Sequence, residues 1–430
     1  MATMPRTARL AVLGLALGSA AAALVAVDRV AGRVVDPRFT PLAGPPETRT
    51  MLVRSEFRVP VRTNAAGFRG AELPGAKPPG TFRIVVLGDS FTWGFGVRER
   101  QAYPARLARL LSRRTGGAPR VEVVNLGLPG AGPLDYLHHL DHTAVALEPD
   151  LIVVGLFAND VNDLYQVRRF GTRSPLYALA ALQAGDGTRP WWKRAAERAT
   201  PNLYAMASRA ASRLQAGPRA ARADVSPVPS VPARAAVDPE AMASALGERY
   251  GRREAVAARY RALPADDRAL LDPVLAGAPL GEDMRPLLLL GALVDPDAER
   301  DSLLLRSDDR RAAWEETRDV LARIVRHARR AGARTVVAVL PASEQVNRAR
   351  WRVLGAAGYR LDPAMLAEAP LADGVRAVAA SEGATAVDLV EAFRRRRDAD
   401  LYFHADEHWT ARGQAYAAAR LAAALLPEVR

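Results

Sequence analysis

The chain has 430 residues, 49% of them hydrophobic and 25% charged, which suits a large globular domain with additions and excludes a wholly disordered chain. Its formal net charge is +13, but the basic residues are spread along the chain and no nucleic-acid-binding motif accompanies them, so we expect no nucleic-acid partner. Because cysteine is absent, disulfides, thiolate nucleophiles and cysteine-ligated zinc are excluded.

The N-terminus has the pattern of an export segment. Arg6 and Arg9 precede an uncharged, alanine-rich stretch at residues 10–27, which Asp28 and Arg29 close. The stretch is longer than an ordinary signal core and barely long enough to span a bilayer. We therefore interpret residues 1–32 as a cleaved signal peptide or an uncleaved anchor. Both predict a periplasmic or otherwise extracytoplasmic protein, held at the inner membrane through residues 10–27 if the segment is retained.

Residues 33–80 are rich in proline and glycine, and we interpret them as a spacer. A regular alternation of strand and helix patterns follows. Short β-branched runs predict strands at 83–87, 121–125, 151–156, 335–340 and 385–389. Helical patterns lie at 103–114, 134–147, 309–330, 374–382 and 410–425. Continuous apolar strands that alternate with helices are typical of an α/β protein whose parallel sheet is covered on both faces. In such sheets, ligands bind beyond the carboxyl ends of the strands.

Residues 164–307 interrupt this alternation after the third strand. The centre of this insertion, residues 217–239, is rich in Pro, Ala and Arg, so we expect it to be poorly ordered. Helices are expected on both sides of it, and the apolar run at 287–294 is too short to span a membrane and should pack on the core. Two interpretations stay open: a helical lid near the functional site, or a peripheral helical addition.

The first predicted strand ends in Gly88-Asp89-Ser90. A serine at a strand-to-helix turn can project its hydroxyl into the crevice at the sheet edge and attack an acyl carbon once a base removes its proton. Taken alone, Ser90 could equally be a helix N-cap.

Two further segments follow the next two strands. The turn after the second strand contains Gly130, and glycines there can direct backbone N–H groups at a ligand. Asn159 follows the third strand, and its amide could donate to a developing oxyanion together with the N–H of Ser90. Each residue also has an ordinary explanation in turn geometry.

Asp406 and His408 come after the fifth strand, just before the final helix, for which Thr410 is the expected N-cap. His408 could be the general base for Ser90, with Asp406 orienting its ring. Glu407 and His404 are the alternatives. A lone histidine is more often structural, but four such segments in order, each at the carboxyl end of a strand, favour a catalytic site.

These four segments resemble the conserved blocks of the SGNH/GDSL hydrolase superfamily of serine esterases and acyltransferases, over residues 83–156 and 309–425. The resemblance implies a three-layer α/β/α sandwich with a five-stranded parallel sheet of the flavodoxin-like type, built from residues 81–163 and 308–430. It implies Ser90 as nucleophile, His408 as base with Asp406, and an oxyanion hole of the Ser90 N–H, the Gly130 N–H and the Asn159 side chain. No cofactor or metal is expected; the neighbouring histidines 138, 139 and 142 are interpreted as exposed helix positions.

The chain departs from the family pattern at two positions. Phe157 stands where the third block usually has glycine, and Ala405 stands where the last block usually has aspartate. Asp406 takes that place, as in the Asp-x-His-Trp pattern of the alginate-O-acetyltransferase-like branch. The segment from Asn64 to Arg69 is similar to one in bacterial membrane-proximal members, without an evident mechanism.

The resulting hypothesis is an exported esterase that hydrolyses an acyl ester, with acetyl as one candidate acyl group. An O-acetyltransferase acting on a cell-envelope polysaccharide through the same triad is the alternative within the same chemistry. A non-catalytic envelope-binding protein is the alternative of another class. The expected partners are an acyl ester or acylated glycan, and the membrane if the N-terminal segment is retained. The oligomeric state is not predicted.

Overall fold

The computed structural model describes residues 6–31, 41–183, 238–396 and 398–429, together with residues 193, 196, 199–200, 202–204 and 206–207. Contacts divide the chain into two compact units, residues 1–40 with 185–220 and residues 41–184 with 221–430. Of the helices expected on both sides of the insertion's centre, the one at residues 191–214 is described only in part, and within the proline-rich stretch at 217–239 only residues 238 and 239 are described.

The smaller unit contains helix α1 (Arg6–Ala31). Near the end of this helix, the buried carboxylate of Asp28 accepts hydrogen bonds from the backbone N–H groups of Asn202 and Leu203, both at 2.9 Å. Among the described residues, no helix combines the length and the apolar character needed to cross a bilayer.

The larger unit is built on a five-stranded sheet in which every neighbouring pair is parallel. The strands are β3 (Thr81–Gly88), β4 (Arg120–Asn125), β5 (Leu151–Leu156), β6 (Arg334–Val339) and β7 (Thr385–Asp388), in the spatial order β4-β3-β5-β6-β7. Strand β5 is buried along its whole length, as expected for a continuous apolar strand covered on both faces. The five predicted strands and the parallel sheet are confirmed.

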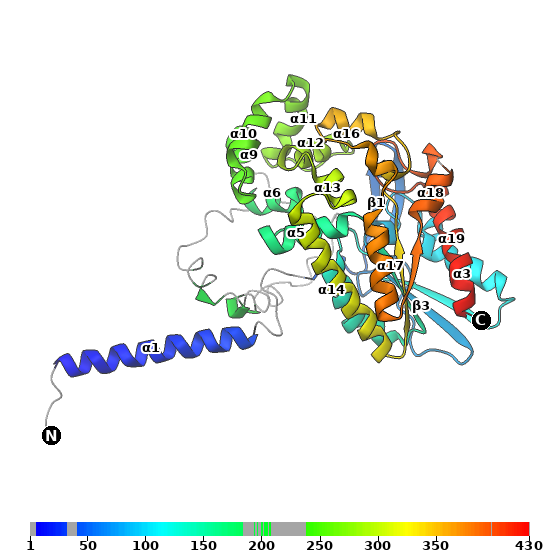
Figure 1. Cartoon of the computed structure of the whole chain (residues 1–430), viewed down its shortest axis with the longest axis horizontal. Helices are drawn as coiled ribbons and strands as arrows, with labels where there is room; N and C mark the ends of the chain where they lie inside the picture. The colour runs from blue at the N-terminus through cyan, green and yellow to red at the C-terminus, as the bar shows by residue number, and fades with distance from the viewer. Residues whose placement is uncertain are drawn as a thin grey trace. The chain divides into compact units, whose positions relative to one another are not determined.

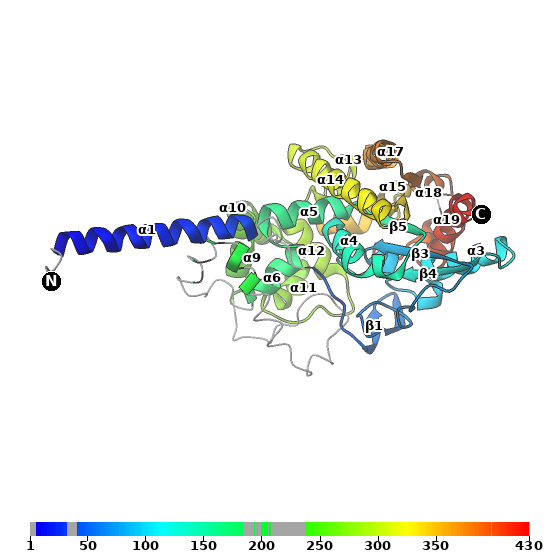
Figure 2. The same ribbon diagram turned by 90° about the horizontal axis from the view of Figure 1, so that it is seen from below.

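Helices cover both faces of the sheet (Figures 1 and 2). The chain leaves β3 toward β4 through α3 (Tyr103–Arg114) and later moves the opposite way, from β5 to β6 through α14 (Asp308–Arg330) and from β6 to β7 through α17 (Pro370–Glu382). Right-handed crossovers in opposite directions place their helices on opposite faces. Accordingly, α14 packs beside α17, while α3 packs beside α19 (Ala411–Val429). The predicted three-layer α/β/α sandwich is confirmed.

This strand order also determines where a ligand can bind. The chain direction reverses between β3 and β5, and in open α/β sheets the crevice for ligands lies beyond the carboxyl ends of the strands at that reversal. Ser90 follows β3, and Asn159 follows β5. The topology therefore brings both residues to one crevice.

The segment that we interpret as a spacer carries an antiparallel hairpin, β1 (Arg49–Arg54) and β2 (Phe57–Arg62). Its inward side chains Leu52, Val59 and Val61 pack in one cluster with Trp93. The hairpin was not predicted, because Pro60 argues against a strand unless its missing N–H faces solvent at an edge. Pro60 is exposed in β2, which satisfies that condition.

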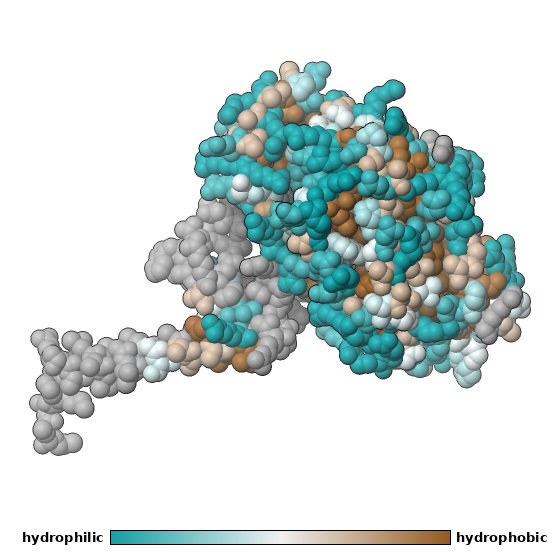
Figure 3. All heavy atoms as spheres, viewed as in Figure 1, coloured by the Kyte–Doolittle hydropathy of each residue, from teal (hydrophilic) through white to brown (hydrophobic). Residues whose placement is uncertain are grey.

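The insertion contains the helices α6 (Pro175–Gln183), α9 (Pro239–Arg249), α10 (Arg253–Ala262), α11 (Ala265–Leu275), α12 (Arg285–Val294) and α13 (Ala298–Leu304). Its helices enclose a hydrophobic cluster separate from the main core, with Leu246, Leu271 and Leu290 fully buried in it. The apolar run at 287–294 forms part of α12 and packs in this second cluster. Hydrophilic residues predominate over α9 and α10 on the face drawn in Figure 3.

Candidate active site

Ser90 stands at a very tight junction between β3 and the short helix α2 (Ser90–Trp93). Asp89 caps this helix, because its Oδ1 accepts a hydrogen bond from the Phe91 N–H at 2.9 Å. A Cβ atom on Gly88 would lie only 2.0 Å from Oγ1 of Thr92, so only glycine permits the close approach of α2 to the strand. The junction leaves the Ser90 side chain partly exposed while the residues around it are buried.

Ser90, His408 and Asp406 form one hydrogen-bonded chain. The Oγ of Ser90 lies 2.7 Å from Nε2 of His408, and Nδ1 of His408 lies 2.5 Å from Oδ1 of Asp406. The same Asp406 oxygen accepts the backbone N–H of His408 at 2.9 Å, which fixes the turn between the two residues. His408 is 8% exposed and Asp406 1% exposed. The structure thus brings together the three predicted residues, which are up to 318 positions apart.

The surroundings favour the ionic states that proton transfer needs. Burial by itself lowers the pKa of His408, but the charge and hydrogen bond of Asp406 outweigh it, so the pKa lies above the usual 6.5. Burial acts to raise the pKa of Asp406, yet the charge and hydrogen bonds of His408 bring it below its usual value. Asp406 is therefore a carboxylate at neutral pH and can stabilise a protonated His408.

Three candidate hydrogen-bond donors belong to residues that follow the carboxyl ends of β3, β4 and β5. They are the N–H of Ser90 at the start of α2, the N–H of Gly130 after β4, and Nδ2 of Asn159 at the start of α5 (Asn159–Phe170). Gly130 has φ of 75°, a left-handed conformation that favours glycine. Within the described part of the chain, none of the three donates to a protein acceptor. Such donors can stabilise a developing oxyanion.

The turns that carry these donors are held by neighbouring side chains. Asn125 donates from Nδ2 to the carbonyl of Thr92 and accepts the Gly127 N–H, both at 2.9 Å, which ties the β4 turn to α2. The buried carboxylate of Asp160 accepts the Phe157 N–H at 2.9 Å and the Tyr136 hydroxyl at 2.7 Å, which fixes the β5 turn.

The hairpin supplies a contact that sequence reasoning missed. Glu56, in the turn between β1 and β2, accepts the backbone N–H groups of three consecutive residues, His404 at 2.5 Å, Ala405 at 2.7 Å and Asp406 at 2.9 Å. These bonds anchor the loop that carries His408. No local pattern marks Glu56, because its partners are about 350 positions away.

An aromatic cluster covers the His408 ring beside this anchor. Phe95 stacks on the ring at a centroid distance of 4.5 Å. Phe57 of the hairpin contacts Phe95 at 5.8 Å and Phe403 at 4.8 Å. The hairpin thus limits the movement of the His408 loop by packing as well as by hydrogen bonds.

The segment from Asn64 to Arg69 holds the loop that follows Ser90. The buried guanidinium of Arg69 donates to the carbonyls of Gly94 at 2.5 Å and Val97 at 2.6 Å, and lies 4.4 Å from the Trp93 ring centroid. Burial lowers the pKa of Arg69 to about 10, so the side chain stays protonated at neutral pH. Asn64 shapes this segment by accepting the Phe68 N–H at 3.0 Å. The motif therefore has a structural explanation.

The two alternative residues, His404 and Glu407, take no part in the hydrogen bonds that link Ser90, His408 and Asp406. Neither the His404 ring nor the Glu407 carboxylate hydrogen-bonds to Ser90 or His408 in the described structure, and burial raises the pKa of Glu407. Within the described residues, no three His, Cys, Asp or Glu side chains lie close enough together to hold a metal ion.

Two protein-family models match the chain. The GDSL-like lipase/acylhydrolase family matches residues 86–292, and the SGNH hydrolase-like domain of the acetyltransferase AlgX matches residues 300–429. No curated protein sequence matches it.

Several solved structures resemble the chain at low identity. TesA is 12% identical to this chain with a TM-score of 0.36, and the match covers 80% of this chain and 98% of the TesA chain. The acetyl xylan esterase AlAXEase is 11% identical to this chain with a TM-score of 0.36, and the match covers 80% of this chain and 100% of the AlAXEase chain. Axe2, an acetylxylan esterase from Geobacillus stearothermophilus, is 12% identical to this chain with a TM-score of 0.36. The match covers 83% of this chain and 96% of the Axe2 chain.

Proposed function

Since this chain belongs to the SGNH/GDSL hydrolase superfamily, we propose that it is an esterase that cleaves an acyl ester, such as an acetyl ester, through an acyl-Ser90 intermediate. The observation that carries the proposal is the continuous hydrogen-bonded chain from Ser90 through His408 to Asp406. The candidate donors at the strand ends, the N–H groups of Ser90 and Gly130 and the Asn159 amide, support it, because acyl transfer needs both an activated nucleophile and donors that stabilise the oxyanion.

In the first half of the proposed reaction, Oγ of Ser90 attacks the carbonyl carbon while Nε2 of His408 takes the hydroxyl proton. Asp406 holds the Nδ1–H of His408 and stabilises the imidazolium. The carbonyl oxygen becomes an oxyanion that accepts hydrogen bonds from the Ser90 and Gly130 N–H groups and from Asn159. When the C–O bond of the ester breaks, His408 returns its proton to the leaving alcohol.

In the second half, a water molecule gives a proton to His408 and attacks the acyl carbon. The acyl–Oγ bond then breaks, and His408 reprotonates Ser90. The products are a carboxylic acid and the free enzyme.

A transferase is the second candidate, in which a sugar hydroxyl replaces this water. The observation that favours it is the match of residues 300–429, which include Asp406, His408 and Trp409, to an acetyltransferase domain. The balance between the two reactions depends on whether water or an acceptor hydroxyl reaches the acyl carbon first. A non-catalytic envelope-binding protein is the third alternative, and the intact Ser–His–Asp chain argues against it.

We also propose that the protein is exported, with residues 1–32 acting as a cleaved signal or a membrane anchor. The charged flanks of residues 10–27 support this proposal. A C-terminal fusion to alkaline phosphatase, an enzyme that folds actively only outside the cytoplasm, should be active, and deletion of residues 1–32 should abolish that activity. Membrane pellets washed with carbonate should retain the protein only if the segment is uncleaved. Equal phosphatase activity with and without residues 1–32 would contradict export.

The decisive experiment on the chemistry is serine-directed fluorophosphonate labelling of the purified protein, followed by measurement of acetate release from p-nitrophenyl acetate. The wild type and a Ser381→Ala control, whose serine is exposed on α17, should be labelled and active. The Ser90→Ala variant should be neither labelled nor active. Labelling that persists in Ser90→Ala would overturn the assignment. Addition of acceptor glycans should raise turnover, with acetyl groups appearing on the glycan, only if the enzyme is a transferase.

A further inference from the structure

Arg350 lies buried beside the loop that carries the proposed base. It directly precedes helix α16 (Trp351–Ala357) and is 3% exposed. Its Nη2 donates to the backbone carbonyl of Ala405 at 3.3 Å. The N–H of Ala405 donates to Glu56 at 2.7 Å, so side chains from two distant segments hold both backbone polar groups of this residue. Because Ala405 is followed by Asp406, the two contacts restrict where that carboxylate lies.

The other end of the Arg350 guanidinium binds a buried carboxylate. Nη1 donates to Oε1 of Glu344 in helix α15 (Ser343–Val346) at 2.8 Å, and Glu344 is 2% exposed. The hydroxyl of Ser343 donates to the same oxygen at 3.0 Å. Removal of either partner of such a pair leaves an uncompensated buried charge. Arg350 is thus held in one orientation while it contacts the His408 loop.

Several carboxylates share the charge of Arg350. Burial by itself lowers the pKa of Arg350, but the carboxylates outweigh burial and hold the pKa above its usual value. They are Glu344, Glu407, Glu299 and Asp406. Burial acts in turn to raise the pKa of the last three, and Arg350 is among the charges that lower it in each. Arg350 is therefore a shared counter-charge for this group of acids.

Asp406 needs such a charge because only one of its two oxygens is hydrogen-bonded. Oδ1 accepts both the backbone N–H and the Nδ1–H of His408, whereas Oδ2 is buried and has no hydrogen-bond partner in the described part of the chain. A buried carboxylate stays ionised only where donors or positive charge compensate its lost hydration. While His408 is neutral, the positive charge of Arg350 favours the ionised form of Asp406.

The same charge acts on His408. Carboxylates gather around the His408 loop from the loop itself and from α2, the hairpin, α15 and the insertion: Asp406, Glu407, Asp89, Glu56, Glu344 and Glu299. Burial by itself lowers the pKa of His408, but the neighbouring carboxylates, Asp406 first, raise it above its usual value. Negative charge favours the protonated imidazole, which cannot accept the proton of Ser90. A buried positive charge among these carboxylates opposes that effect and extends the activity of the base toward lower pH.

We propose that Arg350 is a positioning residue of the His408 loop. Its guanidinium holds the Ala405 carbonyl, and with it Asp406, and supplies the buried positive charge that offsets the carboxylates around His408. Arg350 hydrogen-bonds to neither Ser90 nor His408 among the described contacts, so it acts through the loop and takes no part in proton transfer. The inference rests on the proposed function, since it identifies what sets the pH range over which the Ser90–His408 pair works.

The test records kcat and KM for p-nitrophenyl acetate from pH 5 to 9. In Arg350→Gln, the loss of positive charge should raise the midpoint of the acidic limb by about 0.5–1 pH unit, because it stabilises the imidazolium. Glu344→Gln removes a negative charge from the same group and should move the midpoint the opposite way. Arg350→Lys keeps the charge without the two-ended contact, so it should restore the midpoint while kcat stays about ten-fold below wild type.

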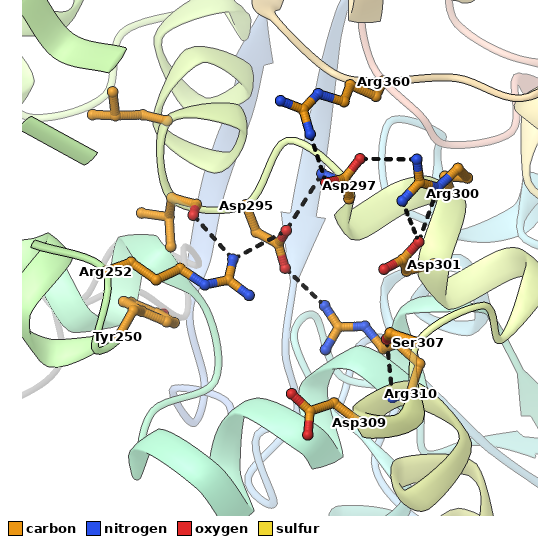
Figure 4. Close-up of polar contacts among 12 residues, drawn as sticks. Tyr250, Arg252, Asp295, Asp297, Arg300, Asp301, Ser307, Asp309, Arg310 and Arg360 are labelled. Atoms are coloured by element: carbon orange, nitrogen blue, oxygen red, sulfur yellow. Dashed lines mark hydrogen bonds and ion pairs between the residues drawn. The ribbon is translucent and has the colours of Figure 1, made fainter. Parts of the chain in front are cut away.

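Arg310→Gln is the matched control. Arg310 is also 3% exposed and pairs with a carboxylate, that of Asp295 at 3.0 Å, as Figure 4 shows. It forms no described hydrogen bond or ion pair with the His408 loop. Arg310→Gln should therefore lower Tm, as Arg350→Gln does, and leave the midpoint of the acidic limb unchanged. A merely structural effect of burying glutamine would appear equally in both variants.

An NMR titration of the histidine ring carbons, assigned with His408→Gln, reads the same shift in the full chain without a substrate. Opposite shifts in Arg350→Gln and Glu344→Gln support the proposal, and shifts in one direction, or none, overturn it. If Arg350→Gln does not fold, an unmoved midpoint in Glu344→Gln still overturns it. A wild-type protein whose esterase activity does not depend on Ser90 would instead contradict the proposed function, whereas Ser90-dependent activity with unmoved midpoints would refute the role of Arg350 alone.

Discussion

The carboxylate of Glu56 accepts a hydrogen bond from the backbone N–H of Asp406 at 2.9 Å, although 350 positions separate the two residues. The N-terminal hairpin therefore holds the carboxylate that in turn orients His408. Glu56 touches neither Ser90 nor His408, so it positions the loop and takes no part in proton transfer itself.

Glu56→Ala should lower kcat about ten- to a hundred-fold with little change in KM, because a displacement of about 1 Å in a catalytic group can cost about a hundred-fold. Steady-state kinetics with p-nitrophenyl acetate measures this. Glu72→Ala is the matched control, since Glu72 also accepts a backbone N–H, that of Ala65 at 3.1 Å, but does not contact the His408 loop. A wild-type kcat in Glu56→Ala would show that the loop keeps its position without the anchor.

His408→Ala should reduce kcat nearly as much as Ser90→Ala, on the order of a million-fold in comparable serine enzymes, because nucleophile and base act as one unit. The double variant should be little worse than either single one. Single-turnover acetate release with wild-type and variant proteins of equal Tm tests this. Effects that multiply in the double variant would mean that Ser90 and His408 act independently.

Asp406→Ala should be less severe than His408→Ala, because the carboxylate orients and stabilises the base without taking the proton. Glu407→Ala should retain more activity than Asp406→Ala, since only Asp406 hydrogen-bonds to Nδ1 of His408. The comparison needs kcat/KM for both variants on one substrate. The reverse order would identify Glu407 as the working carboxylate.

Activity should rise with pH through the pKa of His408, because only the neutral imidazole can accept the proton of Ser90. Since the environment raises this pKa, the midpoint of the acidic limb of kcat/KM should lie above 6.5. Asp406→Asn removes the charge that raises it, so the midpoint should move to lower pH. Profiles recorded from pH 5 to 9 test both statements. A flat profile would exclude a histidine base.

Arg69→Lys should lower the free energy of unfolding by about 2–5 kcal/mol, because a single ammonium cannot replace a planar guanidinium that reaches the carbonyls of Gly94 and Val97 together. Urea denaturation measures the change. Arg58→Lys, an exposed site on β2, provides the control and should change stability by less than about 0.5 kcal/mol. Equal stability of the two variants would refute the proposed role of Arg69.

Much of the fold could be predicted from the sequence, because the strands β3, β5 and β6 are buried along nearly their whole length and are therefore predominantly apolar. The same pattern located the candidate site, since Ser90, Gly130 and Asn159 each follow the carboxyl end of a strand, where parallel sheets bind ligands. The hairpin was not predicted, because a proline argues against a strand unless it lies at an exposed edge, and only the structure shows that Pro60 does.

The sequence by itself determined which residues can supply a nucleophile, a base and oxyanion donors, because those chemical roles need particular residue types at strand ends. Only the tertiary structure decided which carboxylate serves His408, since Asp406 and Glu407 are adjacent and the backbone turn alone directs one of them to Nδ1. The same holds for the contacts of Glu56 and Arg69. Their partners are distant in the chain, and a hydrogen bond or ion pair between distant residues leaves no periodicity in the sequence around either one.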